Sequence, residues 1–370
     1  MYHLRRLSAL VLSLAIAPLL FLPTPAAAAN EDRMPLVLSS ASALLMEKET
    51  GTVLLQQNAH QKLEPASVTK IMTLLLVMEA VDSGRLSLDE LVPVSAHAAG
   101  MGGSQVYLKE GEQLSVSDLI KCVAVVSGND CAVALAERLA GSESAFVDQM
   151  NQKAQSLGMA DTHFVNCTGL PAPGHLTSAW DIALMSRELI LRHPDIQQYT
   201  TIWTDSIRNG AFGLTNTNRL VRFYDGATGL KTGFTASAQY CMSATAQRFQ
   251  DASSLLDYGF ANYALITPQP ESPLAPVDVL LGRSKTVQPQ LQRECHLLVE
   301  KTQADQVTTR VDLAQDVQAP VDPGQTLGEF QVYVGNELRD SVPIVAAQGV
   351  DRLSVPGLFS QLLRRLLFAG

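Results

Sequence analysis

Alternating apolar and polar positions mark two short extended runs near the start of the chain. The runs 42–47 and 52–57 are both β-prone, and the turn residues Glu49, Thr50 and Gly51 lie between them. Two β-prone runs joined by a turn that contains glycine are typical of an antiparallel hairpin. We therefore expect a β-hairpin over residues 42–57.

A helical period replaces this alternation after Pro65. Residues 66–83 carry apolar side chains at helical spacing, and the same period returns at 116–140 and 178–191. Asp181 falls in the first turn of the last stretch, where an acidic side chain interacts favourably with the helix dipole. We expect residues 84–200 to be mainly helical.

Strand-like alternation returns at residues 239–245, and a helical pattern follows at 254–263. Residues 267–276 are rich in proline, which favours a linker between domains. Beyond it, residues 277–348 are rich in valine, threonine and turn residues, which predicts a small all-β domain. The order of hairpin, helical insertion and further strands predicts an α+β first domain with a helical second lobe, and a site between the lobes.

The N-terminal segment reads as a secretory signal peptide. Arg5 and Arg6 precede the almost wholly apolar run 7–22, and alanines at 26–29 suit cleavage before Asn30. An uncleaved anchor helix is the alternative, but the apolar run is short for a membrane span.

The C-terminal segment 357–370 has an amphipathic pattern. Its apolar stripe lies opposite Gln361, Arg364 and Arg365. Two cations beside an apolar face suit an anionic membrane surface. We expect membrane contact, with packing on the β domain as the alternative.

Composition narrows the possible functions. The chain has 370 residues, of which 46% are hydrophobic and 17% charged, so it can build a sizeable core and is not a disordered chain. Its formal net charge of −9 argues against nucleic acid as a partner. The cysteines are odd in number and lack zinc-motif spacing, so we expect buried free thiols.

The first chemical motif is Ser67-Val68-Thr69-Lys70, at an expected helix start. Residues at i and i+3 share one helix face, so the lysine amine can reach the serine hydroxyl. The helix N-terminus favours negative charge on the serine oxygen, and burial turns a lysine into a base. Alone, this motif is more often an ordinary solvated helix start.

Two further motifs lie downstream. Ser127-Gly128-Asn129 joins two apolar helical runs, where polar groups need hydrogen bonds; a simple helix cap is the alternative. Lys231-Thr232-Gly233, followed by Phe234, begins a strand. Its cation and hydroxyl suit a carboxylate, and its glycine lets a substrate backbone approach. The alternative there is an ordinary turn lysine.

Together, the three motifs match in order and context the S-x-x-K, S-x-N and K-T-G set of penicillin-binding proteins and serine β-lactamases. The chain resembles the low-molecular-mass D-alanyl-D-alanine carboxypeptidases, particularly the sporulation-associated type of spore-forming bacteria. The stretches Glu64–Lys70, Asn166–His175 and Asp225–Thr235 also carry this resemblance, which extends over nearly the whole chain.

The resemblance implies a domain plan. A signal peptide at 1–29 precedes a β-lactamase/transpeptidase-like domain at 30–266, with an antiparallel sheet plus a helical lobe. A small β-rich domain at 277–350 and an amphipathic membrane-associating helix at 351–370 follow.

The resemblance also implies the catalytic roles. Ser67 attacks the carbonyl between two D-alanines and forms an acyl-enzyme, while Lys70 acts as the general base. Ser127 relays a proton to the leaving D-alanine. Backbone N–H groups of Ser67 and Phe234 form the oxyanion hole.

The implied substrate-binding residues are Asn129, Lys231, Thr232 and Gly233, together with Phe234. Asn129 holds the substrate amide, Lys231 and Thr232 receive the terminal carboxylate, and Gly233 allows close approach. No metal and no organic cofactor is implied.

The implied partners are peptidoglycan stem peptides ending in D-Ala-D-Ala, β-lactam antibiotics and, through the terminal helix, the membrane surface; nucleic acid is not among them. The implied location is the outer, cell-wall side of the cytoplasmic membrane, with peripheral attachment. A class A β-lactamase is an alternative, although it seldom carries an added β domain.

The chain departs from the family pattern near residue 248. A segment with one apolar β-strand is absent; in the family topology this strand lies mid-sheet, between the first strand and the strand at 239–245. Either residues 42–47 pair directly with 240–245, or the domain is weakened, because unpaired buried backbone groups cost about 1–3 kcal/mol each. A peptidoglycan-binding pseudoenzyme is therefore another alternative.

Overall fold

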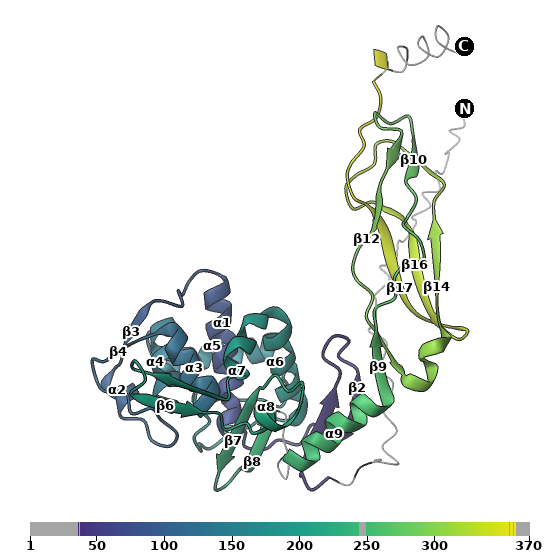
Figure 1. Cartoon of the computed structure of the whole chain (residues 1–370). Coiled ribbons are helices and arrows are strands. Elements are labelled where there is room, and N and C mark those ends of the chain that lie inside the picture. The colour runs from purple at the N-terminus through teal and green to yellow at the C-terminus, as the bar shows by residue number, and fades with distance from the viewer. Residues whose placement is uncertain (1–35, 37, 244–248, 355, 358, 360–370) are drawn as a thin grey trace, which may run out of the picture.

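The chain forms a helix-rich domain and an elongated β domain that stands beside it (Figure 1). The structure is a computed structural model that describes residues 36, 38–243, 249–354, 356–357 and 359. The helices of the first domain are η1 (Ala66–Thr69), α1 (Lys70–Asp82), α2 (Ala96–Ala99), α3 (Val116–Val126), α4 (Asn129–Ala140), α5 (Glu143–Ser156), α6 (Ala179–Arg192), η2 (Pro194–Ile196), α7 (Gln197–Thr200), α8 (Leu220–Phe223) and α9 (Phe249–Asn262). Its strands are β1 (Ala43–Met46), β2 (Val53–Gln57), β3 (Leu91–Pro93), β4 (Gln113–Ser115), β5 (Thr204–Ile207), β6 (Phe212–Thr215), β7 (Lys231–Thr235) and β8 (Gln239–Ser243).

Helix α1 is the centre of the helical lobe. Its residues 70–78 and Ala80 are all buried. A helix buried on every side has to be enclosed by other elements, and α3, α4, α5 and α6 pack around it. The expected helix over 66–83 is confirmed, with its first turn wound as the 3₁₀ helix η1.

Serine side chains fix the starts of two neighbouring helices. Ser115 caps α3 and Ser178 caps α6, each accepting the N–H three residues on. Asp181 lies in the first turn of α6, as expected. The expected helical stretch 116–140 breaks at Ser127, which has a left-handed backbone with φ 63°.

The antiparallel strands on either side of the helical insertion form two separate hairpins. β1 pairs with β2 and β7 pairs with β8, and no ladder joins β1 to β8 among the described residues. Both hairpins contact α6. The Ser186 hydroxyl on α6 bonds that of Ser243 in β8, and Arg187 donates to the carbonyl of Lys48, just after β1.

This arrangement bears on the absent strand. β8 is followed by residues 244–248, which lie outside the description, and then by α9. Of the two expected outcomes, direct pairing of 42–47 with 240–245 is not found in the part of the chain that the structure describes. The hairpins share one supporting helix instead of one sheet.

Helix α9 covers the hairpin of β1 and β2. Leu255 packs against Ala43 and Leu55 in a small core of its own. The helix begins earlier than the expected 254–263, and Tyr263 already belongs to a strand.

The second domain is built mainly from strands, as expected. A four-stranded antiparallel sheet, in the order β12-β17-β16-β14, is the largest. β9 pairs with β13, so the hydrogen-bonded ladders of this domain begin at Tyr263, ahead of the expected 277. The elements are β9 (Tyr263–Ile266), β10 (Val277–Leu280), β11 (Thr286–Val287), β12 (Pro289–Leu291), β13 (Leu297–Glu300), η3 (Lys301–Gln306), β14 (Val307–Leu313), β15 (Asp316–Gln318), β16 (Thr326–Val334) and β17 (Glu337–Ala346).

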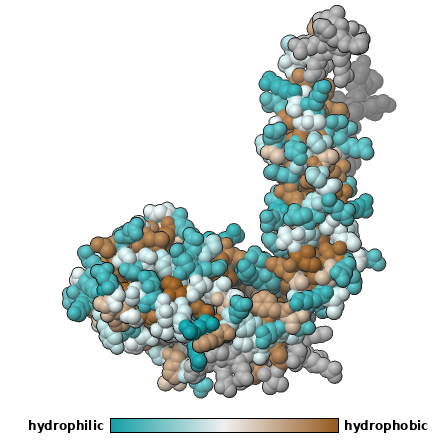
Figure 2. All heavy atoms as spheres, viewed as in Figure 1, coloured by the Kyte–Doolittle hydropathy of each residue, from teal (hydrophilic) through white to brown (hydrophobic). Residues whose placement is uncertain are grey.

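The predictions for the two ends of the chain fall almost entirely outside the residues that the structure describes. The signal segment 1–29 lies outside the described residues, as does the amphipathic stretch 357–370 apart from Gly357 and Phe359. Within the described part of the chain, no helix has the length and apolar character needed to span a membrane. Figure 2 shows hydrophilic and hydrophobic residues interspersed over the viewed face of both domains. All the cysteines are free thiols, and all but Cys241 are buried, as expected.

Candidate active site

Ser67 and Lys70 are brought together by the tight winding of η1. Side chains three residues apart are eclipsed in a 3₁₀ helix, and the Lys70 Nζ donates to the Ser67 Oγ at 3.0 Å. The turn is entered through Ala66, which has a left-handed backbone with φ 46°. Residues with side chains rarely adopt this conformation, which persists where the surroundings impose it.

The Lys70 amine is enclosed by acceptors. It is fully buried, and it donates also to the Asn129 Oδ1 at 2.6 Å and to the carbonyl of Thr168 at 2.7 Å. Burial lowers the pKa of Lys70 to about 7, although the Asp130 carboxylate acts in the opposite direction. A lysine of this pKa is partly neutral at physiological pH and can take the Ser67 proton.

The segment between α3 and α4 supplies the next polar groups. Asn129 is fixed by its N–H to the carbonyl of Ser104 and by its Nδ2 to the carbonyl of Gly102, which leaves its Oδ1 for Lys70. The Ser127 Oγ is buried and has no hydrogen-bond partner within the described structure. An unbonded buried hydroxyl costs about 1–3 kcal/mol, so it marks a group that a substrate can complete.

Strand β7 forms the opposite wall. Lys231 is buried, and its Nζ donates to the carbonyl of Thr232 at 2.8 Å. Burial and the positive charge of Lys70 lower the pKa of Lys231 well below its ordinary value. A bound carboxylate would offset this, because an anion stabilises the charged form of a lysine.

Glycine at 233 lets β7 pack directly on η1. A Cβ there would lie 2.9 Å from the nitrogen of Ser67 and 3.0 Å from that of Val68, closer than real Cβ atoms tolerate. Phe234 follows on the exposed side of the strand, with its ring 4.5 Å from that of Tyr240. The K-T-G motif therefore stands beside the Ser67 turn, as the resemblance implied.

Thr217 is a contact that the motifs did not reveal. Its Oγ1 lies 2.6 Å from the Thr232 Oγ1, and its N–H donates to the carbonyl of Val125 at the end of α3. It thus joins strand β7 to the helical lobe. The sequence carries no motif that would single out this threonine.

The loop 166–170 holds the carbonyl that binds Lys70. The Asn166 Oδ1 accepts hydrogen bonds from the N–H groups of Thr168 and Gly169, which folds the loop tightly. Gly169 has φ 83°, and a Cβ there would lie 1.8 Å from the carbonyl oxygen of Ala66. Only glycine permits this approach to η1. The stretch 166–175, which contains this loop, is one of those that carry the family resemblance. The sequence alone implied no role for the loop.

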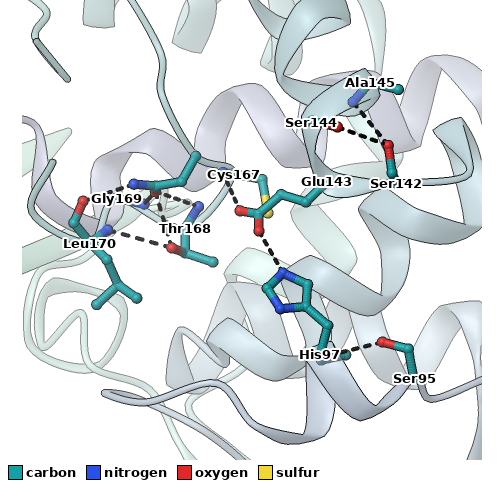
Figure 3. Close-up of polar contacts among 12 residues, drawn as sticks. Ser95, His97, Ser142, Glu143, Ser144, Ala145, Cys167, Thr168, Gly169 and Leu170 are labelled. Carbon is teal, nitrogen blue, oxygen red and sulfur yellow. Dashed lines mark hydrogen bonds and ion pairs between the residues drawn. The ribbon is translucent and has the colours of Figure 1, made fainter.

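A partly buried carboxylate anchors this loop from behind. Figure 3 shows the Glu143 side chain between the His97 ring and the backbone of Cys167. Glu143 accepts from the Cys167 N–H at 3.1 Å and contacts the His97 Nε2 at 2.8 Å. Burial raises the pKa of Glu143, but the hydrogen bonds from His97 and Cys167 outweigh it and the net shift is downward. No motif in the sequence singles out Glu143 or His97.

His175 ties the other end of the segment to η1. Its Nε2 lies 2.8 Å from the Thr69 Oγ1, and its Nδ1 accepts from the N–H of Val165. Burial and the neighbouring His163 lower the pKa of His175 to about 4, so its ring is neutral and structural.

The arrangement has the components of acyl transfer. A hydroxyl bonded to a partly neutral lysine, an unbonded second hydroxyl and a second buried lysine lie around one turn. No cluster of three or more metal-ligating side chains exists in the part of the chain that the structure describes.

Solved structures define the class of the fold. Penicillin binding protein 5 from Haemophilus influenzae is similar with a TM-score of 0.71 and 26% identity, over 86% of this chain and 100% of that one. Penicillin-Binding Protein D2 from Listeria monocytogenes, solved in an ampicillin-bound form, is similar with a TM-score of 0.55 and 34% identity, over 62% of this chain and 100% of that one. The fold is that of a penicillin-binding protein.

Sequence comparison gives the family. A family model described as D-alanyl-D-alanine carboxypeptidase (Peptidase_S11) matches residues 27–254, and one described as the penicillin-binding protein 5 C-terminal domain matches 269–352. DacF of Bacillus subtilis, a D-alanyl-D-alanine carboxypeptidase, is 36% identical over 369 residues, covering 93% of this chain and 95% of the relative. DacC of Escherichia coli is 31% identical, covering 90% and 89%. The chain belongs to the D-alanyl-D-alanine carboxypeptidase family, whose members are hydrolases.

The resemblance inferred from the three motifs is therefore confirmed. The pseudoenzyme alternative finds no support, because the family and the relatives are named for carboxypeptidase activity.

Proposed function

We propose that this chain is a serine D-alanyl-D-alanine carboxypeptidase that removes the terminal D-alanine from peptidoglycan stem pentapeptides. The observation that carries the proposal is the Lys70 amine, which is buried, has a pKa of about 7 and lies 3.0 Å from the Ser67 Oγ. A buried amine of this kind turns an unreactive hydroxyl into a nucleophile.

The first half of the reaction forms an acyl-enzyme. The Ser67 Oγ attacks the carbonyl carbon between the two D-alanines while its proton passes to the neutral Lys70 Nζ. The N–H groups of Ser67 and Phe234 stabilise the developing oxyanion, a contribution of about 3 kcal/mol for each such donor. The C–N bond then breaks, and a proton relayed through Ser127 leaves with the D-alanine amine.

The terminal carboxylate of the substrate orients this step. Lys231 and Thr232 receive it, and Gly233 leaves room for the substrate backbone along β7. Asn129 holds the substrate amide while its Oδ1 keeps Lys70 in place. Positioning of this kind supplies a large part of the barrier reduction, because it replaces random encounter.

The second half consumes water. Lys70 takes a proton from the water, whose oxygen attacks the acyl carbon. The C–O bond to Ser67 then breaks, the proton on Lys70 returns to the Ser67 Oγ, and the shortened peptide is released. We extend the proposal to β-lactams, which would acylate Ser67 in the same way and leave slowly. The ampicillin-bound form of the Listeria protein supports this extension.

The test uses the purified chain, diacetyl-L-lysyl-D-alanyl-D-alanine and a fluorescent penicillin. We expect D-alanine release and a stable penicilloyl adduct, both lost in Ser67→Ala. Ser156→Ala, at an exposed serine on α5, is the matched control and should retain both. No D-alanine release at any enzyme concentration would overturn the proposal, and rapid penicillin turnover would favour a β-lactamase.

We further propose the domain plan stated above, with a signal peptide at 1–29, a catalytic domain from residue 30, a β domain up to 350 and a membrane-associating helix at 351–370. The boundary between the catalytic and β domains moves from 266 to Tyr263, because β9 pairs with β13. The chain would then act on the wall side of the cytoplasmic membrane. Sedimentation with phosphatidylglycerol vesicles tests the helix, because each of Arg364 and Arg365 should contribute about 1 kcal/mol of binding. A chain ending at residue 350 should stay in the supernatant; equal sedimentation would refute the attachment.

A further inference from the structure

An open pocket of about 730 Å³ lies between the loop 106–112 and the hairpin of β5 and β6. The rings of Tyr107 and Phe212 line it, with centroids 6.4 Å apart. In Figure 1, β4, which follows the loop, and β6 lie at the same end of the helical lobe. None of the residues assigned to the reaction lines this pocket, which we call the Tyr107 pocket.

The backbone conformation and the exposure of Tyr107 both cost free energy of folding. Its backbone is left-handed with φ 59°, and its side chain is 65% exposed. A left-handed residue with a side chain costs about 1–2 kcal/mol, and exposing a large ring forgoes the gain from burial. Neither cost improves the fold, and strained residues of this kind cluster at ligand contacts.

The surroundings hold Tyr107 in this conformation from both sides. The Asp130 Oδ2 accepts from the N–H groups of Val106 and Leu108, the residues that flank it. Arg208 donates to the carbonyls of Val106 and Tyr107. The ring is therefore presented by a fixed backbone, so it is preorganised for a ligand.

The charges around the pocket balance. Arg208 is paired with Glu112 at 2.7 Å, and the remaining charged lining residues are Lys109 and Glu110, of opposite sign. A balanced rim gives no net attraction to a phosphate or a carboxylate. Two aromatic rings in a pocket that is also lined by polar side chains suit an uncharged ring that has an apolar face and hydroxyl edges, which is the chemistry of a sugar.

The loop that lines the pocket is connected to the proposed active site through Asn129. Ser104, two residues before this loop, accepts the Asn129 N–H on its carbonyl, and Ser104 and Tyr107 are at most ~10 Å apart along the chain. A stem peptide held by its fourth residue can extend up to ~14 Å toward the sugar that carries it. The stem peptide therefore has the length to extend from Ser67 past Asn129 toward the loop that carries Tyr107.

We propose that the Tyr107 pocket binds one uncharged sugar of the glycan to which the stem peptide is attached. The inference rests on the proposed function, and it makes glycan-linked stem peptides better substrates than free peptides. Tyr107 is a specificity-determining residue in this proposal and takes no part in the chemical step.

The test compares kcat/KM for diacetyl-L-lysyl-D-alanyl-D-alanine with kcat/KM for a disaccharide pentapeptide. Tyr107→Gly removes the ring and suits the left-handed backbone, so it should fold. We expect the ratio of glycan-linked to free-peptide kcat/KM to fall about tenfold, through KM, as one aromatic contact is lost. Tyr107→Phe should keep the ratio. Phe260→Ala, which removes an exposed ring on α9, is the matched control and should keep it too.

Each outcome separates the two proposals. An unchanged ratio in Tyr107→Gly would overturn the sugar-binding proposal and leave the carboxypeptidase proposal intact. This includes the case in which kcat/KM falls equally for both substrates. An absence of D-alanine release from both substrates by the unaltered chain would instead refute the proposed function.

Discussion

Gly169 and Gly174 form a natural pair for testing how closely the active-site loop must approach η1. Both have a left-handed backbone, with φ 83° and φ 82°. An added Cβ at Gly169 would lie 1.8 Å from the carbonyl oxygen of Ala66, whereas at Gly174 it would meet nothing within 4 Å. Gly169→Ala and Gly174→Ala therefore share the backbone cost, about 1–2 kcal/mol, and differ in the steric one.

The steric cost falls directly on the proposed base. The contact in Gly169→Ala must open from 1.8 Å to the 3.4 Å of ordinary van der Waals contact. The preceding carbonyl, that of Thr168, bonds Lys70 at 2.7 Å, so a retreat of this size removes the hydrogen bond or moves the amine. A displacement of about 1 Å at a reacting group can cost about 100-fold in rate.

We expect Gly169→Ala to acylate with fluorescent penicillin about 100-fold more slowly than Gly174→Ala in stopped-flow measurements. Thermal unfolding of Gly174→Ala should show a fall of about 2–4 °C for each kcal/mol, with acylation near that of the unaltered chain. Acylation by Gly169→Ala within fivefold of Gly174→Ala would show that the loop carbonyl does not position Lys70.

Three further predictions concern the same groups. Because Lys70 has a pKa of about 7, its neutral fraction rises with pH, so the acylation rate should rise about tenfold from pH 6 to pH 8; a flat profile would contradict its role as base. Asn129→Asp places a negative charge where an oxygen lies 2.6 Å from the Lys70 Nζ, which stabilises the ammonium, so the midpoint of that profile should move to higher pH. Thr217→Val removes the hydroxyl that bonds Thr232, and KM for the peptide should rise about fivefold with a smaller change in kcat; an unchanged KM would exclude Thr217 from carboxylate binding.

Sequence patterns predicted the elements that depend on local spacing. Helix α1 follows from its apolar period, the hairpin of β1 and β2 from side-chain alternation, and the β domain from its valine, threonine and turn residues. The three motifs marked the residues that meet at η1, because their order and context are specific. The partners that position these residues were not predictable: Thr217, Glu143 and the carbonyl of Thr168 act through tertiary contacts between segments far apart in the sequence. Local patterns carry no information about such contacts.

The separation of the two hairpins has a consequence for local stability. Since no ladder ties β8 to β1 in the described residues, the hairpin of β7 and β8 rests on α6 and η1 through side chains and close packing. Segments held in this way open as independent cooperative units, at a free energy below that of global unfolding. Amide hydrogens of β7 should then exchange faster than those of α1. On heating, the hairpin that carries the proposed carboxylate-binding residues would therefore unfold first. The turn that carries Ser67 would still be folded at that temperature.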